Sequence, residues 1–139
     1  TSDEGSWTSP FTVHIYPDNE PLVPVLLYND HNFNPAGADN DGLAEGGESI
    51  TMPLSLWNDG ADTARNVAAV LTCADADINI TDANEHFADI PMNSEMWTNY
   101  DFNFDIASGI LAERDVEFVL EITSDEGSWT SPFTVHIYP

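Results

Sequence analysis

An acidic stretch between residues 39 and 48 carries the strongest chemical pattern in this sequence. It reads Asp-Asn-Asp-Gly-Leu-Ala-Glu-Gly-Gly-Glu. Calcium-binding loops of the helix–loop–helix type have acids at positions 1, 3, 5 and 12 and a glycine at position 6, where the chain turns sharply. Asp39, Asp41, Gly42 and Glu48 match positions 3, 5, 6 and 12, but position 1 is Gly37. The flanking residues also lack a helical pattern, so this is not a loop of that type.

The stretch still favours a calcium site of related design. Calcium binds six to eight oxygen atoms, which carboxylates, side-chain amides and backbone carbonyls all supply. The alternative interpretation is a solvated acidic turn whose glycines permit tight bends. The predicted ligands are the carboxylates of Asp39, Asp41 and Glu48, the carbonyl of Leu43, and a further oxygen from Asp30, Asn32 or Asn34.

Catalytic chemistry has little support in the sequence. Cys73 lies at an inward position of a predicted strand, where cysteine is usually structural. One cysteine per repeat also excludes a disulfide within the domain. The histidines show no zinc spacing, and neither a phosphate loop nor a nucleophile elbow is present. We therefore predict no enzyme, with no catalytic residue and no organic cofactor.

The two ends of the sequence carry the same seventeen residues, TSDEGSWTSPFTVHIYP, at 1–17 and again at 123–139. Apolar and polar residues alternate in the second half of this segment, which predicts a half-buried strand. Because one domain has room for one copy, we expect the other copy to bind in a neighbouring domain. The predicted assembly residues are Trp7, Phe11, Val13 and Ile15 in the first copy and Trp129, Phe133, Val135 and Ile137 in the second.

Three interpretations of this duplication stay open. The chain is a window onto a tandem array with a period of 122 residues, or its terminal strand is exchanged between subunits, or the duplication is artificial. Under the first interpretation, residues 1–17 are the terminal strand of a preceding repeat and residues 18–139 are the domain. A denaturing gel separates the first two, because an array is one very long polypeptide.

The charge composition excludes several partners. The chain has 25 acidic residues, two arginines and no lysine, which gives a net charge of −23. Without the copied Asp3 and Glu4, one repeat carries −21. Nucleic acids and anionic membrane surfaces both bind through cations, so neither is expected as a partner. No apolar run is long enough to span a bilayer, and we predict no membrane insertion.

Short alternating segments predict an all-β fold. Seven strands are expected within one repeat, with turn residues between them and no convincing helical period, which indicates an antiparallel β-sandwich. The expected strands begin near Leu22, Ile50, Val67, Ile78, Tyr100, Val116 and Phe133.

The motifs also resemble a known module. Four motifs are similar to those of Ig-like modules in secreted and surface proteins of bacteria and archaea. They are the run D-N-D-G-x-x-x-x-G-E, a hydrophobic strand at 50–57, Asn58-Asp59-Gly60 and Ala64-Arg65-Asn66-Val67. Such modules occur beside gingipain-type peptidase domains. Phe87-Ala88-Asp89-Ile90 and the closing strands fit its later part, so the resemblance covers about residues 21–137. It implies an extracellular Ig-like β-sandwich that acts as a spacer, adhesive or structural unit.

Together these features predict a structural protein. We expect an acidic, calcium-stabilised repeat of an extracellular filament, stalk or cell-surface array, joined end to end through its terminal strand to other copies of itself. The alternative is an adhesin or carbohydrate-binding module of a secreted protein. That alternative needs a surface aromatic platform around Trp57 or Trp97.

Overall fold

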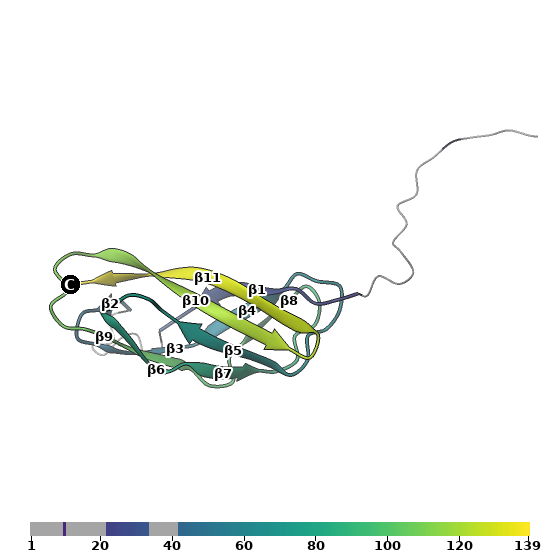
Figure 1. The fold of residues 1–139 in the computed structure, drawn as a ribbon, viewed down its shortest axis with the longest axis horizontal. Helices are drawn as coiled ribbons and strands as arrows, with labels where there is room; N and C mark the ends of the chain where they lie inside the picture. Colours follow the sequence, from purple (N-terminus) through teal and green to yellow (C-terminus); the bar gives the residue numbers. More distant parts are fainter. Residues whose placement is uncertain (1–9, 11–21, 34–41) are drawn as a thin grey trace, which may run out of the picture.

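The computed structural model describes Pro10, residues 22–33 and residues 42–139, and these form an elongated all-β body (Figure 1). Within these residues there are eleven strands and no helix. The strands are β1 (Leu26–His31), β2 (Ala44–Glu45), β3 (Ser49–Met52), β4 (Leu54–Asn58), β5 (Val67–Thr72), β6 (Ile78–Asp82), β7 (Asn84–Phe87), β8 (Ser94–Trp97), β9 (Phe102–Ile106), β10 (Arg114–Ser124) and β11 (Gly127–Tyr138).

The described strands form three sheets. One has five strands in the order β2-β11-β10-β5-β7, and two have three strands in the orders β1-β4-β8 and β3-β9-β6. All pairs are antiparallel except that of β11 with β2. The buried face of the five-stranded sheet contacts both smaller sheets, because Phe118 of β10 packs against Phe104 of β9 and Phe133 of β11 stacks on Tyr28 of β1. The core is therefore one continuous layer between the large sheet and the two small ones.

The segment 50–57 accounts for one of the four strands beyond the expected seven. Ile50, Met52, Leu54 and Leu56 are all buried, as the alternation predicts. However, the segment is divided at Pro53 into β3 and β4, which belong to different sheets. Proline has no N–H to donate to a strand ladder, so it suits the point where the chain leaves one sheet for another.

The other expected strands are largely present. The inward positions of β5 and β10 are buried, Ile78 of β6 is buried while Ile80 is only partly buried, and β1 lies at a sheet edge, as Pro24 suggests. Tyr100 was expected on the inward face of the strand at 100–106, but it is 78% exposed because β9 begins only at Phe102. The strands β2, β7 and β8 have two to four residues and too few alternating positions for a pattern to appear.

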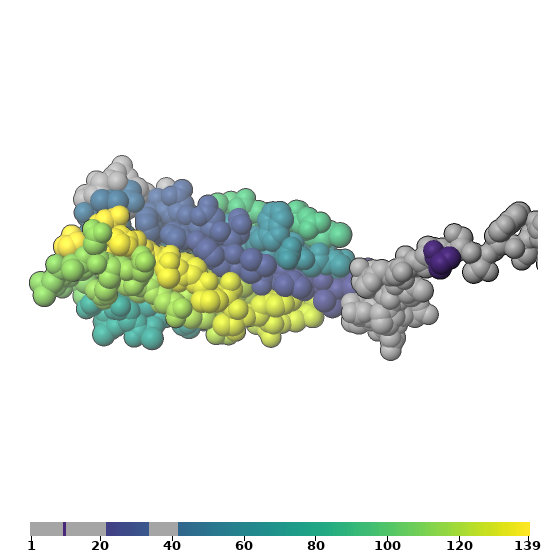
Figure 2. Space-filling model, turned by 90° about the horizontal axis from the view of Figure 1, so that it is seen from above, coloured from purple at the N-terminus to yellow at the C-terminus, as the bar shows by residue number. Residues whose placement is uncertain are grey.

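The second copy of the duplicated segment forms β11. This strand pairs with β10 over eleven residues, from Arg114↔Ile137 to Ser124↔Gly127. Phe133, Val135 and Ile137 are buried in the core. Its other edge touches β1, where Ser131 Oγ accepts a hydrogen bond from the Tyr28 N–H at 2.9 Å, and Figure 2 shows these two segments side by side.

The buried side chain of Asn58 fixes the segment that leads into β1. Asn58 Oδ1 accepts hydrogen bonds from the N–H groups of Val25 and Gly60, and Nδ2 donates to the carbonyls of Asp62 and Ile90. All four hydrogen-bonding positions of the amide are therefore used, which a buried amide requires.

Gly60 lies directly against the same segment. A Cβ at this position would lie 2.4 Å from the Val23 oxygen and the Val25 nitrogen. The N–H groups of Asp59 and Ala61 donate to the carbonyls of Val25 and Val23 at 2.8 Å. The chain therefore enters the domain along a fixed path, and only glycine allows the approach.

The chain enters and leaves the domain at opposite ends (Figure 1). The proximal end contains residues 22–25, the turn at 58–61 and Met92 with Asn93, whose N–H donates to the Asn58 carbonyl. The distal end contains Tyr138, Gly46 and the loop at 107–113, and there the Gly46 N–H donates to the Tyr138 carbonyl at 2.9 Å. The long antiparallel pair of β10 and β11 runs between the two ends.

Candidate functional site

The predicted calcium stretch is described only in part. Asp39, Asp41 and Asn34 lie outside the described residues. Glu48 is buried, and its Oε1 accepts a hydrogen bond from the Glu45 N–H at 2.8 Å, while the Glu48 N–H donates to the Glu45 carbonyl at 3.2 Å. Gly47 within this turn has a φ of +87°, a conformation that favours glycine. The Glu48 carboxylate therefore holds a tight turn in addition to any role as a ligand.

The two upstream candidates, Asp30 and Asn32, are exposed. Asp30 Oδ1 accepts a hydrogen bond from the His31 N–H, and Asn32 Oδ1 accepts one from the Phe33 N–H. The register of β1 shifts between Tyr28 and Asp30, so β1 has an extra residue at Asn29. This irregularity sets the side of the sheet that Asp30 occupies.

The shift also brings Tyr28 and His31 together, although two residues lie between them in the sequence. The Tyr28 hydroxyl lies 2.7 Å from His31 Nδ1. Burial raises the pKa of Tyr28 to about 12, and burial lowers the pKa of His31. At neutral pH His31 is therefore an uncharged imidazole hydrogen-bonded to a neutral phenol.

Leu43 lines a shallow hollow of about 220 Å³ near the distal end. The hollow lies between the end of β1, β2 and β11, and its lining includes His31, Phe33, Thr134 and His136. Phe33 and Gly42, which flank residues 34–41, thus lie at the same hollow. Among the residues that the structure describes, no three His, Cys, Asp or Glu side chains gather as a metal site. The calcium site stays a prediction that centres on residues outside this set.

The assembly residues divide between the two copies. Trp7, Phe11, Val13 and Ile15 lie outside the described residues. In the second copy, Trp129 is half-buried against the core, while Phe133, Val135 and Ile137 belong to the core itself. The second copy is therefore an integral strand of its own domain.

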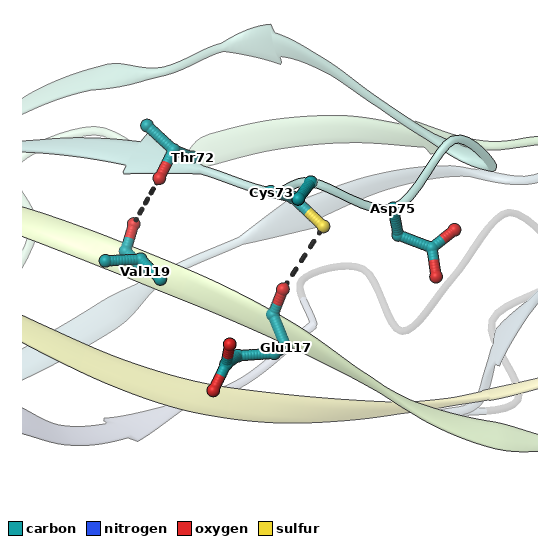
Figure 3. A pocket seen from close by; sticks show the side chains of 6 residues that line it. Thr72, Cys73, Asp75, Glu117 and Val119 are labelled. Carbon is teal, nitrogen blue, oxygen red and sulfur yellow. Dashed lines mark hydrogen bonds between the residues drawn. The ribbon is translucent and has the colours of Figure 1, made fainter.

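Cys73 borders an open groove of about 530 Å³, where β5 separates from β10 (Figure 3). Its Sγ donates to the Glu117 carbonyl at 3.3 Å, and Thr72 Oγ1 donates to the Val119 carbonyl. Cys73 is half-buried rather than fully inward as the alternation suggested, because it follows the last residue of β5. Burial raises the pKa of its thiol, which lowers its thiolate fraction and so its nucleophilicity.

Trp57 and Trp97 share the outer face of the sheet β1-β4-β8. Trp97 pairs with Ser55 and Trp57 pairs with Glu95, so the two rings lie at diagonal positions. Between them, Glu95 Oε2 accepts hydrogen bonds from Asn29 Nδ2 and from Ser55 Oγ. Trp97 is partly exposed and Trp57 is half-buried.

The two arginines each bind carboxylates at one end of the domain. At the proximal end, Arg65 Nη1 lies 3.2 Å from Glu126 Oε2 and 3.7 Å from Asp62 Oδ2. At the distal end, Arg114 Nη2 donates to Asp75 and Asp77 at 2.9 Å, which lowers the pKa of Asp75. Because the sequence contains no lysine, most of the acidic side chains have no lysine or arginine to pair with.

A cluster of carboxyl groups around Glu85 was not predicted from the sequence. Burial, a hydrogen bond with Asp82 and the charges of Asp82 and Asp101 raise the pKa of Glu85 to about 7. Burial also raises the pKa of Asp101. Glu85 alternates with Phe87 on the inward side of β7, so a strand prediction at 84–87 would have revealed it. At neutral pH this carboxyl group is partly protonated and hydrogen-bonded to Asp82.

Comparison of the sequence with models of protein families gives no match, and comparison with curated proteins gives none. The resemblance to an Ig-like module therefore rests on the motifs alone. None of the described residues belongs to a helix that could span a bilayer.

We predict that Glu85 makes stability depend on pH. Its pKa is about 7 in the folded state against 4.5 ordinarily, so the folded protein binds this proton more tightly. The resulting stabilisation is complete below pH 4.5 and is lost as pH rises through about 7. In urea denaturation Glu85 should therefore contribute a decrease in the free energy of unfolding between about pH 5 and about pH 8, against which the lowered pKa of His31 contributes an increase.

The substitution Glu85→Gln should flatten this decrease, because an amide does not ionise. The exposed Glu117→Gln is the matched control and should keep the wild-type slope. An equal slope in all three proteins would show that Glu85 does not titrate in this range.

Proposed function

We propose that this protein is a repeating structural unit of an extracellular filament, stalk or cell-surface array, in which copies follow one another end to end. The observation that carries this proposal is the position of β11. A strand that is identical in sequence to residues 5–16 pairs with β10 through eleven of its twelve residues and buries three apolar side chains in the core.

One domain of this kind has a single position, between β10 and β2, in which this strand can be buried. Burying Phe133, Val135 and Ile137 is worth roughly 5–9 kcal/mol, at about 1.5–3 kcal/mol for each side chain. The identical first copy offers the same apolar face, and its place in the domain formed by residues 22–139 is already taken by β11. A second domain with the same β10 edge and core would accept it. A tandem array with a period of 122 residues would therefore contain the same segment at 1–17 and at 123–139.

The opposite positions of the two ends support an extended assembly. A chain that enters at the proximal end and leaves at the distal end adds its next unit along the long axis (Figure 2). The segment at 22–25 is held by Asn58 and by the turn at Gly60, so it is not a loose tether. These features favour a stiff row of domains over a cluster.

We interpret the three sheets as an Ig-like β-sandwich. In this interpretation the five-stranded sheet forms one layer, and β1-β4-β8 with β3-β9-β6 form the other. The passage of the chain between the two small sheets at Pro53 and the parallel pairing of β2 with β11 at the domain edge support it. Calcium bound at 39–48 would reduce the repulsion among the acids of that stretch.

The length of the native polypeptide tests the array. We expect a single polypeptide with a mass far above 15.3 kDa on a denaturing gel. Limited proteolysis should give a ladder whose step is one repeat of 122 residues. A native chain that dissociates to about one repeat would instead indicate strand exchange, and a monomer of one repeat in solution would overturn the proposal.

The two copies of the strand allow a matched comparison within the 139-residue chain. Phe133→Ala should lower the free energy of unfolding by about 3–5 kcal/mol, since it removes a buried ring that stacks on Tyr28. Phe11→Ala should change the stability of the isolated chain by less than about 0.5 kcal/mol. Urea denaturation measures both. Equal losses would mean that both copies bind in the domain, which contradicts one place per domain.

Calcium binding is tested by melting the protein with and without a chelator. A ligand present at roughly 100 times its Kd adds about 2.7 kcal/mol, so chelation should lower Tm by several degrees. Asp39→Asn with Asp41→Asn should abolish this difference. Glu48 is left intact, because its carboxylate also holds the turn at Glu45.

The matched control for the calcium experiment is Asp89→Asn with Glu117→Gln, which removes two exposed carboxylates elsewhere. These variants should respond to the chelator as the wild type does. Identical melting curves of the wild type with and without chelator would remove calcium from the proposal.

A further inference from the structure

Exposed large apolar side chains also occur on the sides of the domain, Tyr100 among them, but the four most exposed aliphatic side chains lie at its two ends. At the distal end, Leu111 is 95% exposed at the tip of the loop between β9 and β10. At the proximal end, Leu22 is 70%, Met92 48% and Val23 42% exposed. Neither set packs on the core of its own domain.

Both sets are held in place by the fold. Next to Leu111, Ile110 is buried against Gly46, where its Cγ1 would lie 3.0 Å from an added Cβ. The Gly46 N–H in turn donates to the Tyr138 carbonyl, so the loop tip stands beside the point where the chain leaves. At the other end, hydrogen bonds from Asp59 and Ala61 hold Val23 and Val25.

The proposed array brings these two ends together. Tyr138 corresponds to Tyr16 of the repeat, and six residue steps lead from Tyr16 to Leu22. A fully extended chain of that length spans at most about 21 Å. The distal end of one unit and the proximal end of the next are thus confined to a small volume, in which a weak contact is enough to order them.

We propose that Leu111 of one unit docks against Leu22, Val23 and Met92 of the following unit, forming a short apolar contact that fixes the angle between neighbours. This inference rests on the proposed tandem array. The apolar contact would make the array stiff, and the partner that Leu111 binds is a second copy of the same domain. Side-by-side contact is opposed by the acidic flanks, whereas at the ends the linker forces approach.

Charge around the contact gives it a characteristic dependence on salt. Beside the Arg65–Glu126 pair, Asp59 and Asp62 add negative charge at the proximal end, and beside the Arg114–Asp77 pair, Asp75, Glu113 and Asp115 add it at the distal end, where His136 contacts the last two. Like charges therefore face each other across the junction. Added salt screens this repulsion and should strengthen the contact, whereas a contact made of ion pairs would weaken.

The test uses a chain of two repeats, residues 1–139 followed by a further copy of residues 18–139. Small-angle X-ray scattering measures how narrowly its radius of gyration is distributed. Leu111→Ser in the first repeat or Met92→Ser in the second removes one side of the junction. We expect either change to lower the ratio of docked to undocked molecules, by roughly tenfold for Leu111→Ser, and to broaden the distribution.

The matched controls carry the same substitutions at the outer ends. Leu111 of the second repeat and Met92 of the first have no neighbouring unit, so variants with serine at these positions should scatter as the wild type does. The wild-type distribution of the radius of gyration should narrow further as salt is raised. A broad wild-type distribution, or equal scattering from all four variants and the wild type, would overturn the contact while leaving the array intact. A native chain of one repeat would instead overturn the array, whatever the two-repeat chain shows.

Discussion

A strand with one apolar face can be buried only once in a given domain, and the structure of this protein depends on that constraint. β11 fills its place between β10 and β2, and the core closes around Phe133, Phe118 and Tyr28. The same strand joins the large sheet to β1, because Ser131 bonds the backbone of Tyr28. Without β11, both the edge of β10 and the aromatic layer would be open to water.

The second organising feature is the clamp at the proximal end. A single buried amide, Asn58, connects the incoming segment, the turn after β4 and the segment before β8. Gly60 lets the backbone of residues 23–25 approach closely enough to bond with that turn. Hydrogen bonds therefore hold the backbone of the described domain at both of its ends, at residues 23–25 and at Tyr138.

The negative charge of the surface limits which contacts the sides of this domain can make. Two arginines serve two local carboxylate groups, and the remaining acids give the surface one sign. Burial of Glu85 beside Asp82 shows the same excess inside the fold, where the pKa of Glu85 is raised to about 7. Such a surface favours solubility and discourages lateral contact. It leaves the exposed apolar side chains at the two ends and the outer tryptophan face as the places where partners could bind.

Sequence alone determined the all-β class, the buried faces of β5, β10 and β11, and the offset of 122 residues between the two identical segments, since alternation and identity are properties of the chain itself. It could not determine that Pro53 divides one apparent strand between two sheets, that Tyr100 is exposed, or that Glu85 is buried. Those facts depend on which strands become neighbours. Tertiary structure also decided that the two ends lie at opposite poles, because only the packed order of strands sets their positions.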